Sequence, residues 1–218
     1  MPGRHDANDI EAAAGPCLAA RRLGLSRAGR PVFSGIDFAL APGGLLQVTG
    51  ANGSGKSSLL RVLSGLLPPS AGELCWQARP VRGGDPAYLQ SVAYVGHADG
   101  IDPDLSPFEN LRFAMRVAGG APGRAAIERA MADWGIARAT SAPVRRLSQG
   151  QRRRVALVRL SLSPRRLWLL DEPLTSLDAA AAECFQARLD AHLHEGGMAV
   201  VATHQPLANR GRLLRLGG

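Results

Sequence analysis

Short apolar runs and longer helical repeats alternate along this chain. The apolar runs occupy residues 45–49, 91–95, 167–170 and 198–203. Runs of this length that are bounded by turn residues are typical of buried strands. Residues 33–40 alternate instead, with Ile36, Phe38 and Leu40 on one face, which predicts a half-buried strand. Two further strands are predicted at residues 17–25 and 73–76.

Helical spacing separates these strands. Leucines recur at this spacing from residue 59 until Pro68; they are Leu59, Leu60, Leu63, Leu66 and Leu67. A second helix is predicted to begin at Ser106, because Pro107 suits the first helical position and Glu109 closes a capping box. Its apolar face either packs into the core or docks a partner. That face consists of Phe108, Leu111 and Met115. Further helices are predicted at residues 125–134, 154–162 and 179–194.

This arrangement predicts one α/β domain over residues 16–218, with an inserted helical subdomain at about residues 101–163. Residues 1–15 are polar and alanine-rich, and we expect them to form a disordered extension. No apolar stretch approaches the roughly 20 residues of a spanning helix, and no signal peptide is visible. We therefore expect a cytosolic protein, or one that is peripheral on the cytosolic side of a membrane.

The chain has 218 residues and a formal net charge of +8. An arginine-rich solvated surface explains this charge, and attraction to an anionic membrane or to nucleic acid are the alternatives. Cys17, Cys75 and Cys184 stand singly, without metal-ligand or redox spacing, which indicates reduced structural thiols.

The most informative stretch is a glycine-rich loop between the strand at residues 45–49 and the first helix. It consists of Gly50, Ala51, Asn52, Gly53, Ser54, Gly55, Lys56 and Ser57, followed by Ser58. The spacing fits the phosphate-binding P-loop, in which glycines let backbone N–H groups point at an anion. Lys56 can reach the outer phosphates, and the Ser57 hydroxyl can ligate Mg²⁺. Lys56 is also the only lysine in the chain.

Polar residues mark three more element boundaries. Ser148 and Gln151 fit a capping box, where the helix N-terminus either binds an anion or is an ordinary cap. Asp171 and Glu172 stand at the end of an apolar strand. One interpretation is a solvated acidic turn at the surface. In magnesium-dependent phosphate chemistry, Asp171 can hold the metal and Glu172 can deprotonate the attacking water. His204 follows the strand at 198–203.

The order and separation of these motifs resemble the nucleotide-binding subunits of ABC transporters. The resemblance rests on the P-loop, Leu147-Ser148-Gln149-Gly150-Gln151, Asp171-Glu172, Ser176-Leu177-Asp178 and His204. It covers about residues 17–216 and implies a P-loop NTPase fold. That fold is an α/β ABC-type ATPase core with an antiparallel β part and an inserted α-helical subdomain that carries the signature.

The resemblance also implies a mechanism with ATP and Mg²⁺. Two copies dimerise head to tail, and each ATP lies between the P-loop of one copy and the signature of the other. The signature residues are Ser148, Gln149, Gly150 and Gln151. Asp171 and Ser57 serve Mg²⁺, Glu172 is the general base, His204 contacts the γ-phosphate and Asp178 lies at the dimer seam. Loss of the γ-phosphate then weakens the dimer.

Several local sequences are similar to those of one subfamily, the ATPases of bacterial haem exporters in cytochrome c biogenesis. These are Phe33-Ser34-Gly35, Gly72-Glu73 with Trp76, Gly96-His97, Gly100-Ile101 and Thr203-His204-Gln205-Pro206-Leu207. The similarity implies an ATPase on the cytoplasmic side of the inner membrane, with a membrane-spanning permease and without nucleic acid. His97 stands where relatives carry a glutamine that links nucleotide to the permease.

Other functions stay open from sequence alone. They are an ABC ATPase with another cargo, a soluble ABC-type ATPase acting on nucleic acid, and a non-hydrolysing regulatory module. The single P-loop without coiled-coil insertions disfavours the second, and the full set of Lys56, Asp171, Glu172 and His204 disfavours the third. No aromatic residue near 26–29 can stack on adenine, so Arg27 or no specific group contacts the base, and the choice between ATP and GTP stays open.

Overall fold

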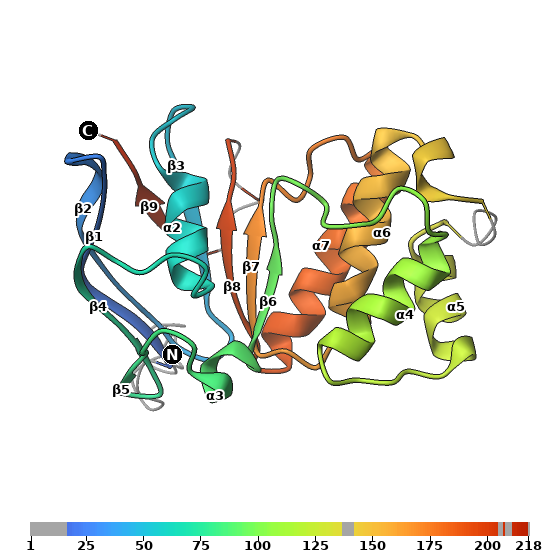
Figure 1. Cartoon of the computed structure of the whole chain (residues 1–218), viewed down its shortest axis with the longest axis horizontal. Coiled ribbons are helices and arrows are strands. Elements are labelled where there is room, and N and C mark those ends of the chain that lie inside the picture. The colour runs from blue at the N-terminus through green and yellow to red at the C-terminus, as the bar shows by residue number, and fades with distance from the viewer. Residues whose placement is uncertain (1–16, 137–141, 205–206, 208–210, 218) are drawn as a thin grey trace, which may run out of the picture.

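The computed structural model describes residues 17–136, 142–204, 207 and 211–217, and the predicted extension at residues 1–15 lies outside them. Two sheets and the helices packed on them make up this part of the chain (Figure 1). Parallel strands alternate with helices along the sequence, which confirms the predicted α/β class.

The larger sheet is parallel, with the strand order β6-β7-β8-β3-β9. Its strands are β6 (Val92–Val95), β7 (Leu167–Asp171), β8 (Met198–Ala202), β3 (Leu45–Thr49) and β9 (Arg212–Arg215). Every residue of β7 and β8 is buried, which explains their continuous apolar runs. The sequence did not predict β9, because this edge strand is mostly exposed and begins and ends with arginine.

Each face of this sheet belongs to a different apolar core. The helices concerned are α2 (Lys56–Leu63), α6 (Gln149–Leu162) and α7 (Ala179–His194). Leu167 and Leu169 of β7 pack with α2 in one core. Trp168 and Leu170 pack with α6 and α7 in the other. Neighbouring residues of a strand point to opposite faces, so the two cores share each strand residue by residue.

The smaller sheet is antiparallel, with the order β2-β1-β4-β5. Its strands are β1 (Leu18–Arg27), β2 (Arg30–Leu40), β4 (Ala71–Trp76) and β5 (Arg79–Pro80). It contributes to the same core as α2 and reaches the predicted P-loop directly. A Cβ on Gly55 would lie 3.0 Å from the Val32 side chain. The two-residue strand β5 is too short to be predicted from periodicity.

The remaining helical elements are α3 (Pro86–Leu89), α4 (Pro107–Val117), α5 (Arg124–Asp133) and the 3₁₀ turn η2 (Val144–Arg146). The capping box at the start of α4 is confirmed, and the Ser106 hydrogen bonds lower the pKa of the Glu109 carboxyl. Leu111 and Met115 are buried and Phe108 is half-buried, so this face packs into the interior. The division that makes residues 101–163 a separate subdomain stays a prediction.

The helix after the P-loop is shorter than its leucine repeat predicts. α2 ends at Leu63, and Gly65 follows with a φ of 77°. The N–H of Gly65 donates to the Val62 carbonyl and that of Leu66 to the Arg61 carbonyl, which is a Schellman ending. Leu66 is therefore 63% exposed instead of buried on the helix.

A stacked pair of rings connects the start of β7 to the last turn of α7. The His192 ring lies parallel to that of Trp168, with centroids 3.9 Å apart, and its Nε2 lies 3.2 Å from the Met198 carbonyl oxygen. Burial lowers the pKa of His192.

Among the described helices, none combines the length and hydropathy needed to cross a membrane.

Lowering the pH from about 7.5 to about 5.5 should reduce the free energy of unfolding, because the unfolded chain protonates His192 below about pH 6.5 while the folded state resists this. His192→Gln should flatten the dependence, measured by urea unfolding at both pH values. His194→Gln is the control for loss of a histidine from the same helix, since His194 is exposed. Equal slopes in the wild type and His192→Gln would contradict the assignment.

Candidate functional site

The predicted P-loop joins β3 to α2 in the expected strand–turn–helix context. Gly50, Gly53 and Gly55 have φ values of 151°, 80° and 100°, which side chains rarely adopt. Gly55 is the N-cap of α2, and no side chain caps the helix there. The backbone N–H groups at this helix start are therefore available to an anion.

Lys56 lies across the loop and is only 6% exposed. Its ammonium Nζ donates to the carbonyls of Gly50 and Ala51 at 2.9 and 3.0 Å. These bonds keep a buried cation at the mouth of the loop, where a phosphate would meet it. Ser57 and Ser58 follow, both half-buried, in the first turn of α2.

The end of β7 supplies a buried acidic group. Asp171 ends β7 and is 2% exposed, and its Oδ2 has no hydrogen-bond partner among the described residues. The buried Ser54 Oγ is likewise unpartnered. Buried polar atoms normally have partners, and a carboxylate oxygen is a preferred ligand of Mg²⁺. The donor set therefore fits a magnesium–phosphate group at this edge.

Glu172 and His204 meet at the same edge. The His204 Nε2 lies 2.6 Å from the Glu172 Oε1, with side chains 42% and 22% exposed. The backbone of Glu172 has a φ of 49°, and its N–H donates to the Ala202 carbonyl at 2.9 Å. A glutamate in this left-handed region is strained, and such strain is typical of functional sites.

The signature residues begin α6. The Ser148–Gln151 capping box is confirmed, with the Ser148 Oγ accepting from the Gln151 N–H at 3.2 Å. Gly150 fits closely against the next loop, because a Cβ there would lie 2.5 Å from the Ser176 carbonyl oxygen. Asp178 caps α7 through the Ala181 N–H. Each of these residues thus has a structural role within one chain.

The signature and the P-loop are not brought together within this chain. Figure 1 shows the N-terminal ends of α2 and α6 at the same upper edge of the molecule but on opposite sides of β6, β7 and β8. His97 is exposed just after β6. A small cavity of about 60 Å³ lies near it, lined by His97, Asp99, Gln149, Arg153, Glu172, Thr175 and Ser176. This cavity joins the signature side to Glu172.

The sequence matches the ABC transporter family over residues 33–175. The chain belongs to the ABC transporter family. The cytochrome c biogenesis ATP-binding export protein CcmA of Cupriavidus necator is 66% identical over 201 residues, which are 92% of this chain and 88% of that protein. The predicted family resemblance is confirmed.

Solved ABC structures share the fold of this ABC ATPase. A putative ABC transporter ATP-binding protein from Pyrococcus furiosus has a TM-score of 0.80 at 22% identity, over 91% of this chain and 96% of that one. A dimeric ATP-binding cassette in a post-hydrolysis state with ADP and Pi has a TM-score of 0.76 at 21% identity, over 86% and 88%.

The sequence analysis of the ABC ATPase did not predict several residues that line the cavity beside His97. Arg153 lies in a run of three arginines, Arg152 to Arg154, and no local pattern separates the buried member from the exposed one. Asp99 and Thr175 lie in loops without a motif of their own. Arg27, the possible base contact, is exposed at the end of β1.

Gly150→Ala should destabilise the ABC ATPase by about 1–3 kcal/mol, because the new methyl group meets the Ser176 carbonyl oxygen and one backbone segment must shift. Urea unfolding of the purified protein measures this change. Gly83→Ala is the matched control, since a Cβ at Gly83 meets no atom within 4 Å. Similar stability of the two variants would show that Gly150 is not held by this contact.

Proposed function

We propose that this chain is the ATP-hydrolysing subunit of the ABC system that exports or delivers haem for c-type cytochrome biogenesis. The observation that carries the hydrolytic part is the contact between Glu172 and His204 at the edge of the sheet that holds the P-loop. The cytochrome c biogenesis part rests on the 66% identity to the CcmA export protein of Cupriavidus necator.

The residues divide the work at the nucleotide. Lys56 and the N-terminal end of α2 bind the phosphates, and His204 contacts the γ-phosphate. Ser57 and Asp171, whose Oδ2 has no partner among the described residues, would hold Mg²⁺, which neutralises phosphate charge when it is bound. Glu172 takes the proton of the attacking water as the general base.

The working unit is a head-to-tail dimer. The signature at Ser148, Gln149, Gly150 and Gln151 lies away from the P-loop of its own chain (Figure 1). A second copy brings its signature to the ATP, with Asp178 at the seam. The dimeric cassette of similar fold, bound to ADP and Pi, supports the formation of a dimer.

A separate membrane-spanning permease is the other partner, which places the chain peripherally on the cytoplasmic side of the inner membrane. Five large apolar side chains are exposed among the described residues; they are Leu66, Leu89, Phe113, Val117 and Leu213. A groove of about 680 Å³ includes Leu89 and Val117 in its lining. The apolar side chains of this groove support docking of an apolar segment of the permease.

The cargo is proposed to be haem by relationship, since the chain itself has no Cys-x-x-Cys-His motif. ATP is the proposed nucleotide. Among residues 26–29, where relatives contact adenine, the exposed Arg27 is the one basic side chain. An ABC ATPase with another cargo would use the same residues, so the partner protein decides between these functions.

Glu172→Gln should lower ATP turnover by about 100-fold or more, because the amide cannot accept the proton of water. The ATP-bound dimer should then persist, as measured by size-exclusion chromatography with ATP. Lys56→Ala is the comparison, and it should give neither ATP binding nor a dimer. Fast turnover by Glu172→Gln would remove Glu172 as the general base.

Tagged Glu172→Gln protein, recovered with ATP from detergent-solubilised membranes, should bring down a membrane-spanning cytochrome-biogenesis protein. A strain that lacks the gene should regain holo-cytochrome c with the wild-type chain and fail with Glu172→Gln or Lys56→Ala. Recovery of a different permease would keep the ATPase and discard haem. Holo-cytochrome c in the Lys56→Ala strain would contradict coupling to hydrolysis.

A further inference from the structure

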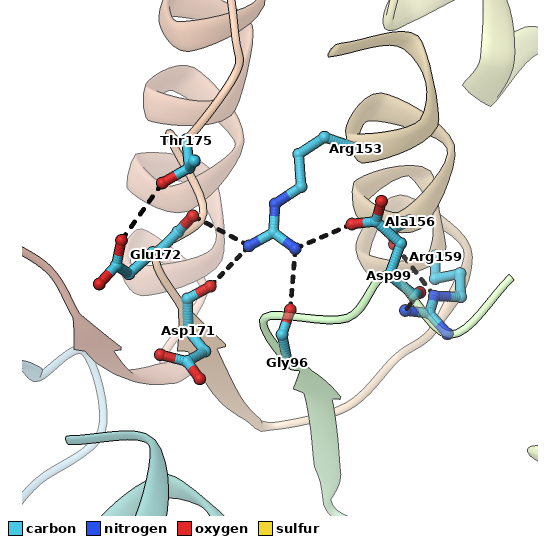
Figure 2. A network of polar contacts seen from close by, with 8 residues as sticks. All are labelled: Gly96, Asp99, Arg153, Ala156, Arg159, Asp171, Glu172 and Thr175. Atoms are coloured by element: carbon cyan, nitrogen blue, oxygen red, sulfur yellow. Dashed lines mark hydrogen bonds and ion pairs between the residues drawn. The ribbon is translucent and has the colours of Figure 1, made fainter. Parts of the chain in front are cut away.

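Arg153 is a buried arginine on the helix that carries the signature, and it is 5% exposed. Its Nη1 donates to the Gly96 carbonyl at 2.8 Å and to Asp99 Oδ1 at 3.0 Å. Its Nη2 donates to the backbone carbonyls of Asp171 and Glu172 at 2.6 and 2.9 Å (Figure 2). One guanidinium thus joins α6, the loop after β6 and the end of β7.

This arrangement needs the guanidinium fork. Four acceptors on two segments are served by two nitrogens in one plane, which an ammonium or an amide cannot match. The Nε of Arg153 is nevertheless buried without a hydrogen-bond partner among the described residues. A buried ion pair with an unpartnered donor is weak support for stability alone, so its placement calls for another explanation.

The segment that Arg153 holds is the strained one. Glu172 has a φ of 49°, and its carbonyl accepts both from Arg153 and from the Thr175 N–H at 3.2 Å. Strained backbone persists only where its surroundings fix it. Fixing the carbonyls of Asp171 and Glu172 fixes the direction in which the Glu172 carboxylate leaves the chain.

A second arginine of α6 strengthens the hold on the loop after β6. The Nη2 of Arg159 donates to the Asp99 carbonyl at 2.8 Å, and its Nε donates to the Ala156 carbonyl at 3.0 Å. Burial lowers the pKa of Arg159, while the Asp99 carboxylate favours its charged form. The loop that carries His97 is therefore attached to α6 through both Arg153 and Arg159.

We propose that Arg153 is a positioning residue for ATP hydrolysis, which orients Glu172 and ties its position to the loop of His97 and to the start of α6. The inference rests on the assignment of Glu172 as general base. Arg153 itself touches neither the nucleotide site nor the carboxylate; it acts through the backbone of residues 171 and 172.

Arg153→Lys keeps the charge and removes the fork. We expect kcat for ATP to fall by about 10- to 100-fold, because small displacements of a catalytic group have effects of this size. The affinity for ATP should stay within about twofold, since the P-loop is untouched. Steady-state kinetics and a fluorescent-nucleotide titration measure the two quantities, and Arg152→Lys, at an exposed site one residue away, should behave as the wild type.

Asp99→Asn separates positioning from stability. It breaks the ion pair but leaves both bonds from Nη2 to the backbone carbonyls, so kcat should fall much less than in Arg153→Lys. Thermal unfolding of each variant identifies any loss of folded protein. Equal losses of kcat in Asp99→Asn and Arg153→Lys, in step with their unfolding temperatures, would overturn the proposal.

A double-mutant cycle tests the route through Glu172. If Arg153 acts through this carboxylate, adding Arg153→Lys to Glu172→Gln should leave the residual turnover unchanged within about twofold. A further 10-fold loss would overturn the proposal, as would a raised KM with unchanged kcat in Arg153→Lys. Failure of Glu172→Gln alone to slow turnover would instead reject the general base, which distinguishes the two assignments.

Discussion

The alignment of parallel strand ends is the constraint on which this structure depends. Asp171 at the end of β7 is level with Ala202 of β8, which is level with Val48 of β3. The P-loop, Glu172 and His204 follow shortly after these residues, so they lie at the same edge of the sheet as Asp171. Ligands of open α/β sheets bind at this edge for the same reason. A register shift of one residue would turn the Asp171 carboxylate to the other face.

The charged side chains at this edge of the sheet are each held by hydrogen bonds or ion pairs. Lys56 is held by backbone carbonyls, Arg153 by carbonyls and Asp99, and Glu172 by His204. Lys56 and Arg153 are cations with almost no exposure. The protein thus places two buried cations at the edge of the sheet that carries the P-loop, where low solvent access strengthens each contact.

Most of the fold and of the candidate site could be predicted, because they depend on sequence motifs whose residues are close together in the chain. The P-loop, the caps at Ser106 and Ser148 and the apolar strands depend on neighbouring residues only. What could not be predicted depends on distant contacts. Leu66 follows the helical repeat but lies beyond a left-handed Gly65, and β9 is recognised as a strand only through its pairing with β3. Arg153 differs from Arg152 through burial alone.

The division of the sheet into two cores has a consequence for how this protein tolerates change. Leu169 packs in the core that contains α2, whereas Leu170, the next residue, packs in the core that contains α6 and α7. The strands therefore act as a partition. A substitution in the core beside α5, α6 and α7 therefore alters one face of the sheet and leaves the residues packed against α2, next to the P-loop, in place.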